Sequence, residues 1–186
     1  MNDKIKILGF AGSLRKESFN RALLRNADKF VPDNARLEIF ELDGIPPFNQ
    51  DTEKEMPQKV REFKSKIKDA DAILISTPEY NYSVPGVLKN AIDFASRPYG
   101  DNPFDGKPVA IMSASIGMLG GARAQYHLRQ IFVFLNMYPI NRPEVMVNFA
   151  TDKFDSEGSL LDETSRELIG ELIQNLVDWV MLLKNN

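Results

Sequence analysis

Three segments of the chain carry the residue types best suited to binding a ligand. In the first, residues 12–20, Ser13, Ser18 and Asn20 offer hydroxyl and amide donors. Arg15 adds a planar guanidinium group that can donate hydrogen bonds to two phosphate oxygens. The helix predicted to follow would add free backbone N–H groups and the positive end of its dipole. This segment therefore predicts an anion site.

The missing motifs narrow the kind of anion. No G-x-x-x-x-G-K-[ST] motif is present, which disfavours a nucleoside triphosphate, and Gly9 and Gly12 lack the spacing of a dinucleotide fingerprint. A terminal phosphate monoester fits the many side-chain donors better. A plainer interpretation stays open, in which Ser18 and Asn20 only cap the helix and Arg15 is solvated.

The second segment, residues 76–86, combines stiffness with aromatic area. Two prolines restrict its backbone, and Tyr80 and Tyr82 offer apolar surface. Asn81 and the backbone of Glu79 and Tyr80 can contact polar atoms in the plane of a ring. This mixture is typical of a site for a planar polar ring system. The alternative is a structural turn with two ordinary surface tyrosines.

The third segment, residues 113–122, is the most glycine-dense part of the chain. Glycines let the backbone approach a flat ligand closely. Ser115 and Gly117 are the predicted contacts. Taken alone, the segment is equally compatible with a flexible connection before a helix.

Alternating strands and helices are predicted to position these segments. Five apolar runs predict strands: Ile5–Phe10, Leu37–Phe40, Ala72–Ile75, Val109–Met112 and Val145–Val147. Helical spacing is found in Arg21–Phe30, Pro57–Ala70, Val87–Ala95, Ala122–Leu135 and Asp162–Leu183. Residues 42–55 and 148–160 are expected to be irregular connections.

This alternation predicts an α/β fold with a parallel sheet covered by helices on both faces. Ala72–Ile75 is apolar at every position, as a central strand requires. Ligands of such sheets bind beyond the carboxyl ends of the strands, which is where all three segments lie. With 186 residues and no linker, one domain over 1–186 is expected.

The overall composition excludes several classes of function. The net charge is −3 and the charges are interspersed, so nucleic acid is not an expected partner. No cysteine and one histidine exclude disulfides and argue against a metal site. Neither a signal peptide nor a membrane-spanning run is visible. We therefore expect a cytoplasmic protein, in which any redox chemistry would have to be supplied by a bound cofactor.

Three motifs together resemble the NAD(P)H-dependent FMN reductases, a family that includes quinone, chromate and azo reductases. They are Gly12-Ser13-Leu14-Arg15-x-x-Ser18-x-Asn20, Thr77–Gly86 with Leu88-Lys89-Asn90-Ala91, and Gly120-Gly121-Ala122-Arg123. The match covers nearly the whole chain, in order. It implies a flavodoxin-like three-layer fold with a five-stranded parallel sheet in the order 2-1-3-4-5.

The resemblance also implies which residues bind FMN. Its phosphate would be held by Ser13 through Asn20, which includes Arg15, Ser18 and Phe19. Its isoalloxazine would lie against Pro78, Glu79, Tyr80 and Asn81, with Ser115 and Gly117 from the third segment. A nicotinamide, NADPH or NADH, would give a hydride that passes on to a small-molecule acceptor. No catalytic acid or base is assigned.

The chain departs from the family at two positions. Glu17 stands where glycine is frequent, and we expect it to point outward so that it does not repel phosphate. Phe94 stands where tryptophan is common.

Members of the family are usually homodimers or homotetramers. Residues 130–138 are apolar nearly all round a helix, which favours association. A polar network of Arg123, Tyr126 and Glu144 at such an interface is our hypothesis.

Other functions are weighed against this one. A non-enzymatic electron carrier of the flavodoxin type would share the fold and FMN. A receiver domain would need an aspartate where Ser76 and Thr77 stand, and no G-x-S-x-G motif supports a hydrolase. His127 is expected to be structural.

Overall fold

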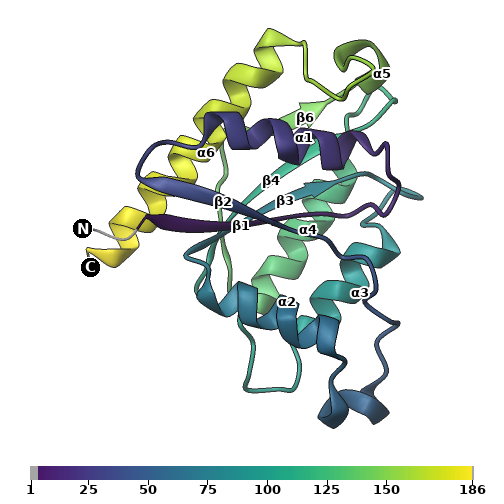
Figure 1. Ribbon diagram of the computed structural model, residues 1–186, viewed down its shortest axis with the longest axis vertical. Coiled ribbons are helices and arrows are strands. Elements are labelled where there is room, and N and C mark those ends of the chain that lie inside the picture. The colour runs from purple at the N-terminus through teal and green to yellow at the C-terminus, as the bar shows by residue number, and fades with distance from the viewer. Residues whose placement is uncertain (1–3, 186) are drawn as a thin grey trace.

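The computed structural model describes residues 4–185, and within them six strands form one parallel sheet (Figure 1). The strands are β1 Ile5–Ala11, β2 Ala35–Phe40, β3 Ala72–Thr77, β4 Pro108–Ala114, β5 Tyr138–Pro139 and β6 Val145–Val147. Their order is β2-β1-β3-β4-β5, with β6 also paired to β4. The predicted order is confirmed.

Helices connect the strands and cover both faces of the sheet. The α-helices are α1 Phe19–Ala27, α2 Gln58–Asp69, α3 Gly86–Ala95, α4 Ala122–Leu135, α5 Ala150–Lys153 and α6 Glu163–Lys184. Two 3₁₀ turns, Asp28–Phe30 and Gln50–Glu55, lie between them. In Figure 1, α1 and α6 lie on one side of the sheet and α2, α3 and α4 on the other.

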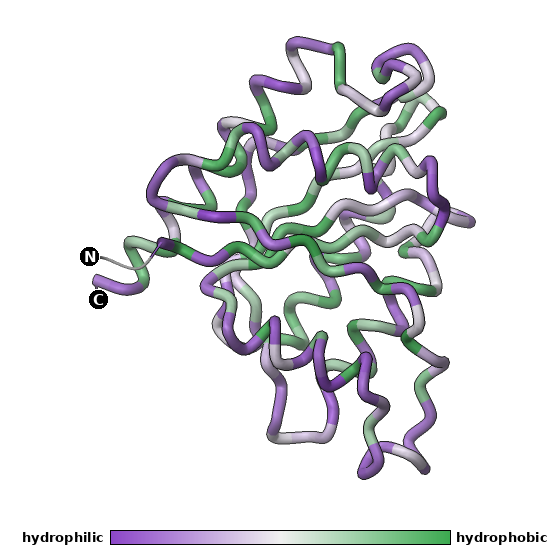
Figure 2. Tube along the Cα trace, in the orientation of Figure 1, coloured by the Kyte–Doolittle hydropathy of each residue, from purple (hydrophilic) through white to green (hydrophobic). Residues whose placement is uncertain are grey.

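Alternate residues of the central strands supply the two cores. In β1, Ile5 and Ile7 face α1 and α6, whereas Leu8 and Phe10 face the other helix layer. Every residue of β3 is buried, because this strand has neighbours on both edges and helices on both faces. Figure 2 accordingly shows hydrophobic residues concentrated along the central strands.

The predicted elements are found, with differences at the fifth strand. That position is shared by β5, paired with the start of β4, and β6, paired with its end. The predicted strand Val145–Val147 is β6, and β5 was missed because two residues show no periodicity. The segments expected to be irregular contain α5 and a 3₁₀ turn. Asp162, the first residue of the predicted helix, caps α6 by accepting a hydrogen bond from the Ser165 N–H at 3.0 Å.

Among residues 4–185, no helix combines the length and the apolar character that crossing a membrane requires.

Candidate functional site

The carboxyl ends of β1, β3 and β4 lie side by side at one edge of the sheet. Ala11 of β1 is in register with Ser76 of β3, and Thr77 of β3 is in register with Ser113 of β4. Because the strands are parallel, the three predicted ligand segments emerge next to one another. The fold therefore places them as a set of adjacent loops.

The first loop ends in a capped helix. Ser18 is the N-cap of α1, and its hydroxyl oxygen accepts a hydrogen bond from the Arg21 N–H at 3.4 Å. Ser13 is buried, and its hydroxyl accepts from the Arg15 N–H at 3.4 Å. Both serine hydroxyls keep a hydrogen that can be donated to a ligand. The capping interpretation is thus correct for Ser18 without excluding the anion site.

Several backbone donors of this loop remain available. In the described chain, the N–H groups of Lys16, Glu17, Phe19 and Asn20 donate no hydrogen bond. Phe19 and Asn20 belong to the first turn of α1, where helix geometry leaves the N–H groups without partners. A row of free donors at the positive end of a helix favours an anion.

Arg15 and Glu17 lie on the outer side of the loop. Arg15 is exposed, with its guanidinium carbon 5.7 Å from the centre of the Phe19 ring, and it donates to the Glu17 carbonyl. Glu17 is exposed, as expected for a side chain that points away from the loop. Arg15 is therefore held near the loop by contacts that a phosphate could replace.

Asn20 has a different role from the one predicted. It is only 3% exposed, and its side chain pairs with the backbone of Ala114, accepting from the N–H at 2.9 Å and donating to the carbonyl at 2.8 Å. The Ser76 hydroxyl also donates to it, at 3.2 Å. The carboxamide thus extends the sheet beside the end of β4 as a peptide group would. This correction makes Asn20 the residue that holds the first loop against β3 and β4, while its backbone N–H remains a possible ligand contact.

The second loop displays its polar and aromatic residues at the surface. Pro78 is half-buried, whereas Tyr80, Asn81 and Tyr82 are exposed. The Glu79 side chain does not face solvent, because it is paired with Arg123 of α4. The Asn81 amide that was predicted to contact a ring is therefore accessible, whereas the Tyr80 N–H and carbonyl are bonded to Ser83.

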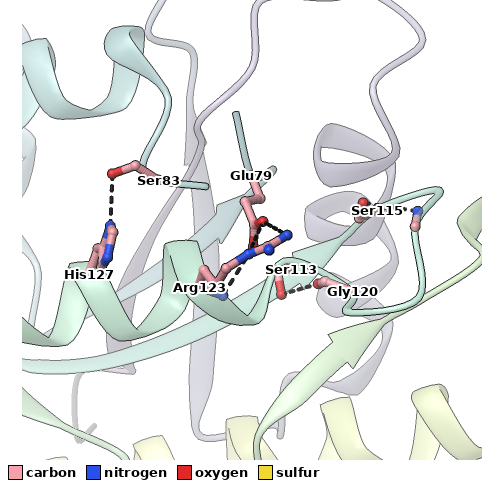
Figure 3. A network of polar contacts seen from close by, with 8 residues as sticks. Glu79, Ser83, Ser113, Ser115, Gly120, Arg123 and His127 are labelled. Atoms are coloured by element: carbon pink, nitrogen blue, oxygen red, sulfur yellow. Dashed lines mark hydrogen bonds and ion pairs between the residues drawn. The ribbon is translucent and has the colours of Figure 1, made fainter. Parts of the chain in front are cut away.

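The third loop is shaped by two glycines in the left-handed region. Gly120 has φ +58° and Gly121 has φ +92°, and a Cβ on Gly121 would lie 2.7 Å from the Cβ of Ser113. The Ser113 hydroxyl donates to the Gly120 carbonyl at 2.6 Å (Figure 3). Predicted contact Ser115 is half-buried and accepts from the N–H of exposed Gly117 at 3.2 Å. The loop is a defined structure and not a loose connection.

A buried glutamine of α4 supports this third loop and was missed from the sequence. Gln125 is fully buried, and its amide nitrogen donates to the Ser113 hydroxyl at 2.7 Å and to the Val145 carbonyl at 2.8 Å. It thereby joins β4, β6 and the loop. No local pattern marks such a residue, since its partners are 12 and 20 positions away.

Two of the three residues of the hypothesised interface network, Tyr126 and Glu144, contact each other within the chain. Tyr126 lies 3.4 Å from the Glu144 carboxylate, and the charge of Glu144 raises the pKa of the Tyr126 hydroxyl above its ordinary value. Arg123, by contrast, pairs with Glu79 within the chain. His127 hydrogen-bonds through Nδ1 to the Ser83 hydroxyl at 2.8 Å (Figure 3), in keeping with a structural role.

Comparison with known proteins identifies the relatives of the chain. Residues 5–152 match the model of a family described as NADPH-dependent FMN reductase. An NAD(P)H-dependent FMN reductase of Pseudomonas aeruginosa is 51% identical, over 99% of this chain and 100% of that protein. A quinone reductase of Escherichia coli is 44% identical, over 92% of this chain and 94% of that protein.

A solved structure has the same fold. The flavoenzyme FerB of Paracoccus denitrificans, an NAD(P)H:(acceptor) oxidoreductase, superposes with a TM-score of 0.85 at 35% identity, covering 95% of this chain and 97% of that one.

Proposed function

Because the chain belongs to the family of NADPH-dependent FMN reductases, we propose that the three adjacent loops bind FMN and that the protein passes electrons from NADPH or NADH to small oxidised acceptors. Bound FMN supplies the redox chemistry that the side chains lack, since it can take up a hydride from a nicotinamide and give two electrons to a second substrate. The enzymatic function is favoured over a non-enzymatic carrier, because the relatives that cover the whole chain are reductases.

The donors of the first loop carry the proposal. The chemistry of a phosphate monoester requires many hydrogen-bond donors, and this loop presents two serine hydroxyls, Arg15 and the four backbone N–H groups of Lys16, Glu17, Phe19 and Asn20 without partners in the described chain. Glu17 is exposed, so solvent screens its charge. The residues present therefore fit the phosphate of FMN.

The other two loops would bind the ring system. Pro78, Glu79, Tyr80 and Asn81 offer backbone and side-chain contacts from the second loop, and Ser115 and Gly117 offer them from the third. Around the third loop, Ile116, Met118 and Phe149 are 69%, 70% and 47% exposed. An apolar rim of this kind favours planar, weakly polar acceptors such as quinones, because burying their apolar surface is favourable.

A visible spectrum of the protein supplemented with FMN tests this function. We expect FMN to bind, and NADPH or NADH added anaerobically to bleach it, and a quinone added afterwards to restore the oxidised spectrum. Bound flavin that neither coenzyme reduces would support the electron carrier instead. A protein that does not bind FMN would refute both functions.

We further propose that the protein is a homo-oligomer that associates through the outer surface of α4. Val133 and Phe134 near the end of this helix are 82% and 77% exposed, and Tyr99 nearby is 74% exposed. Phe134 and Tyr99 border a hollow of about 470 Å³ that is lined by Phe48, Ile92 and Ile131 among others. Exposed apolar side chains beside a hollow of mixed lining, which also includes Lys89, Asp93 and Arg97, suit a self-complementary contact between two copies.

Placing a charge at the centre of this surface should break the oligomer. We expect Phe134→Asp to be a monomer at concentrations where the unaltered protein is larger, because association would bury an unpaired carboxylate. Light scattering coupled to gel filtration measures the mass. Leu161→Asp, at an exposed apolar residue away from α4, is the control and should keep the original mass. An unaltered protein that is itself monomeric would contradict the proposal.

A further inference from the structure

The second loop contains a tight turn in a strained conformation. Tyr80 and Ser83 exchange two backbone hydrogen bonds, N–H to carbonyl, of 3.1 and 3.0 Å. The two residues between them are left-handed, with φ +49° at Asn81 and +67° at Tyr82. Asparagine tolerates this region, but a tyrosine there costs about 1–2 kcal/mol relative to its preferred backbone. Contacts outside the turn must compensate for this cost.

The main outside contact is made by the residue just before the turn. The Glu79 side chain is 8% exposed, and its carboxylate accepts hydrogen bonds from the Arg123 N–H at 3.0 Å and from its Nε at 2.5 Å. A further guanidinium nitrogen of Arg123 also contacts the carboxylate (Figure 3). Both guanidinium nitrogens contact Oε1, whereas the backbone N–H is bonded to Oε2. Charge-assisted hydrogen bonds such as these are roughly twice as strong as neutral ones.

Glu79 also provides the cap that α4 lacks. The N-cap residue of α4 is Gly121, which has no side chain to accept a hydrogen bond. The Glu79 carboxylate bonds to the N–H of Arg123, the second residue of the helix, and is favourably placed for the helix dipole. The second loop is thus attached to the helix that follows the third loop.

Two contacts return from α4 to the turn itself. The guanidinium carbon of Arg123 lies 3.4 Å from the centre of the Tyr82 ring, a cation–π contact that fixes the strained residue. One helical turn further on, His127 hydrogen-bonds to the Ser83 hydroxyl at 2.8 Å. The turn is therefore held on both sides by one face of α4 (Figure 3).

Glu79 and Arg123 are arranged to hold the turn in place and not to transfer a proton. The Glu79 carboxylate is occupied by three donors of Arg123. Its hydrogen bonds raise the pKa of the Arg123 guanidinium further above the physiological range, so this partner stays charged. A base needs a free lone pair directed at its substrate, which this geometry does not offer.

We propose that Glu79 and Arg123 are a pair of positioning residues that hold the Tyr80–Ser83 turn in the shape that binds the FMN ring. This inference rests on the proposed function, in which Asn81 and its neighbours contact the isoalloxazine. The pair also couples the second loop to the third through α4. Its loss should loosen both loops on the two sides of the ring.

A double-mutant cycle on FMN binding tests the pair. Glu79→Gln keeps the size of the side chain but removes its charge and one of its two acceptor oxygens. We expect its FMN dissociation constant to rise about tenfold, and the visible circular dichroism of bound FMN to change. The effect should vanish when Glu79→Gln is introduced into Arg123→Met, because the partner is already absent. Glu38→Gln, in an exposed ion pair with Lys66, is the matched control and should bind FMN normally.

Two results would overturn the proposal. One is a Glu79→Gln protein of lower melting temperature whose FMN affinity and circular dichroism are unchanged, which would make the pair merely structural. The other is a double-mutant cycle in which the effects of Glu79→Gln and Arg123→Met on the FMN dissociation constant multiply, as they do for residues that act independently.

Hydrogen exchange of the FMN-free protein separates this proposal from the proposed function. The Tyr80 and Ser83 N–H groups should exchange at least about tenfold faster in Glu79→Gln than in the unaltered protein. Unchanged exchange would refute the pair even if FMN binds elsewhere. Failure of the unaltered protein to bind FMN would refute the function but not the support of the turn.

Discussion

Replacing Gly121 by alanine should lower the free energy of unfolding by about 2–4 kcal/mol. Alanine is strained in the left-handed backbone conformation of this position, and its Cβ would be packed too closely against Ser113. The new Cβ would lie 2.7 Å from the Cβ of Ser113 and 2.9 Å from its Oγ. Ser113 cannot turn away easily, because its hydroxyl is bonded to Gly120 and Gln125. The third loop must therefore move, and with about an ångström of displacement we expect turnover to fall about a hundredfold. Urea unfolding and steady-state NADPH oxidation measure the two effects.

Gly86→Ala is the matched control. Gly86 begins α3, its φ is not positive, and nothing lies within 4 Å of a Cβ placed there. Alanine at this position should leave stability equal or raise it slightly. A Gly121→Ala protein with normal stability and turnover would show that the third loop is not held as described.

Asn20→Ala should be nearly as damaging, because the sheet loses a partner that no other residue replaces. The substitution leaves the Ala114 N–H and carbonyl without their hydrogen bonds in a buried place, which we expect to cost about 2–4 kcal/mol of unfolding free energy. If about 2 kcal/mol of this cost is lost from the free energy of FMN binding, because the first loop is no longer held in place, the affinity for FMN falls about thirtyfold. Urea unfolding and titration of flavin fluorescence provide the measurements.

Asn26→Ala, on the same helix, distinguishes loop placement from general stability. Asn26 is also buried, and it bonds to the Gly158 carbonyl at 2.8 Å and the Leu160 N–H at 3.1 Å. Its loss should destabilise the protein by a similar amount, while FMN affinity should fall less than in Asn20→Ala, since Asn26 itself makes no hydrogen bond to the three loops. Equal loss of FMN affinity in both variants would contradict a specific role for Asn20.

Local patterns were sufficient to predict the order and type of the main elements. Ala72–Ile75 is uniformly apolar because a central strand is buried on both faces, and this feature is visible in the sequence without any partner. The helix Ala122–Leu135 and the strand Val145–Val147 were predicted to the residue. The strand Tyr138–Pro139 was not, since its pairing with β4 depends on tertiary placement.

The sequence by itself determined the α/β fold, the three loops at the carboxyl ends of the strands and the residue types suited to a phosphate and a planar ring, because these depend on composition and periodicity over short stretches. Only the tertiary structure decided how the side chains are used. Asn20 pairs with Ala114, 94 residues away, and Glu79 pairs with Arg123, 44 residues away. A hydrogen-bonding side chain finds whichever partner the fold brings within about 3 Å, and sequence spacing does not encode that distance.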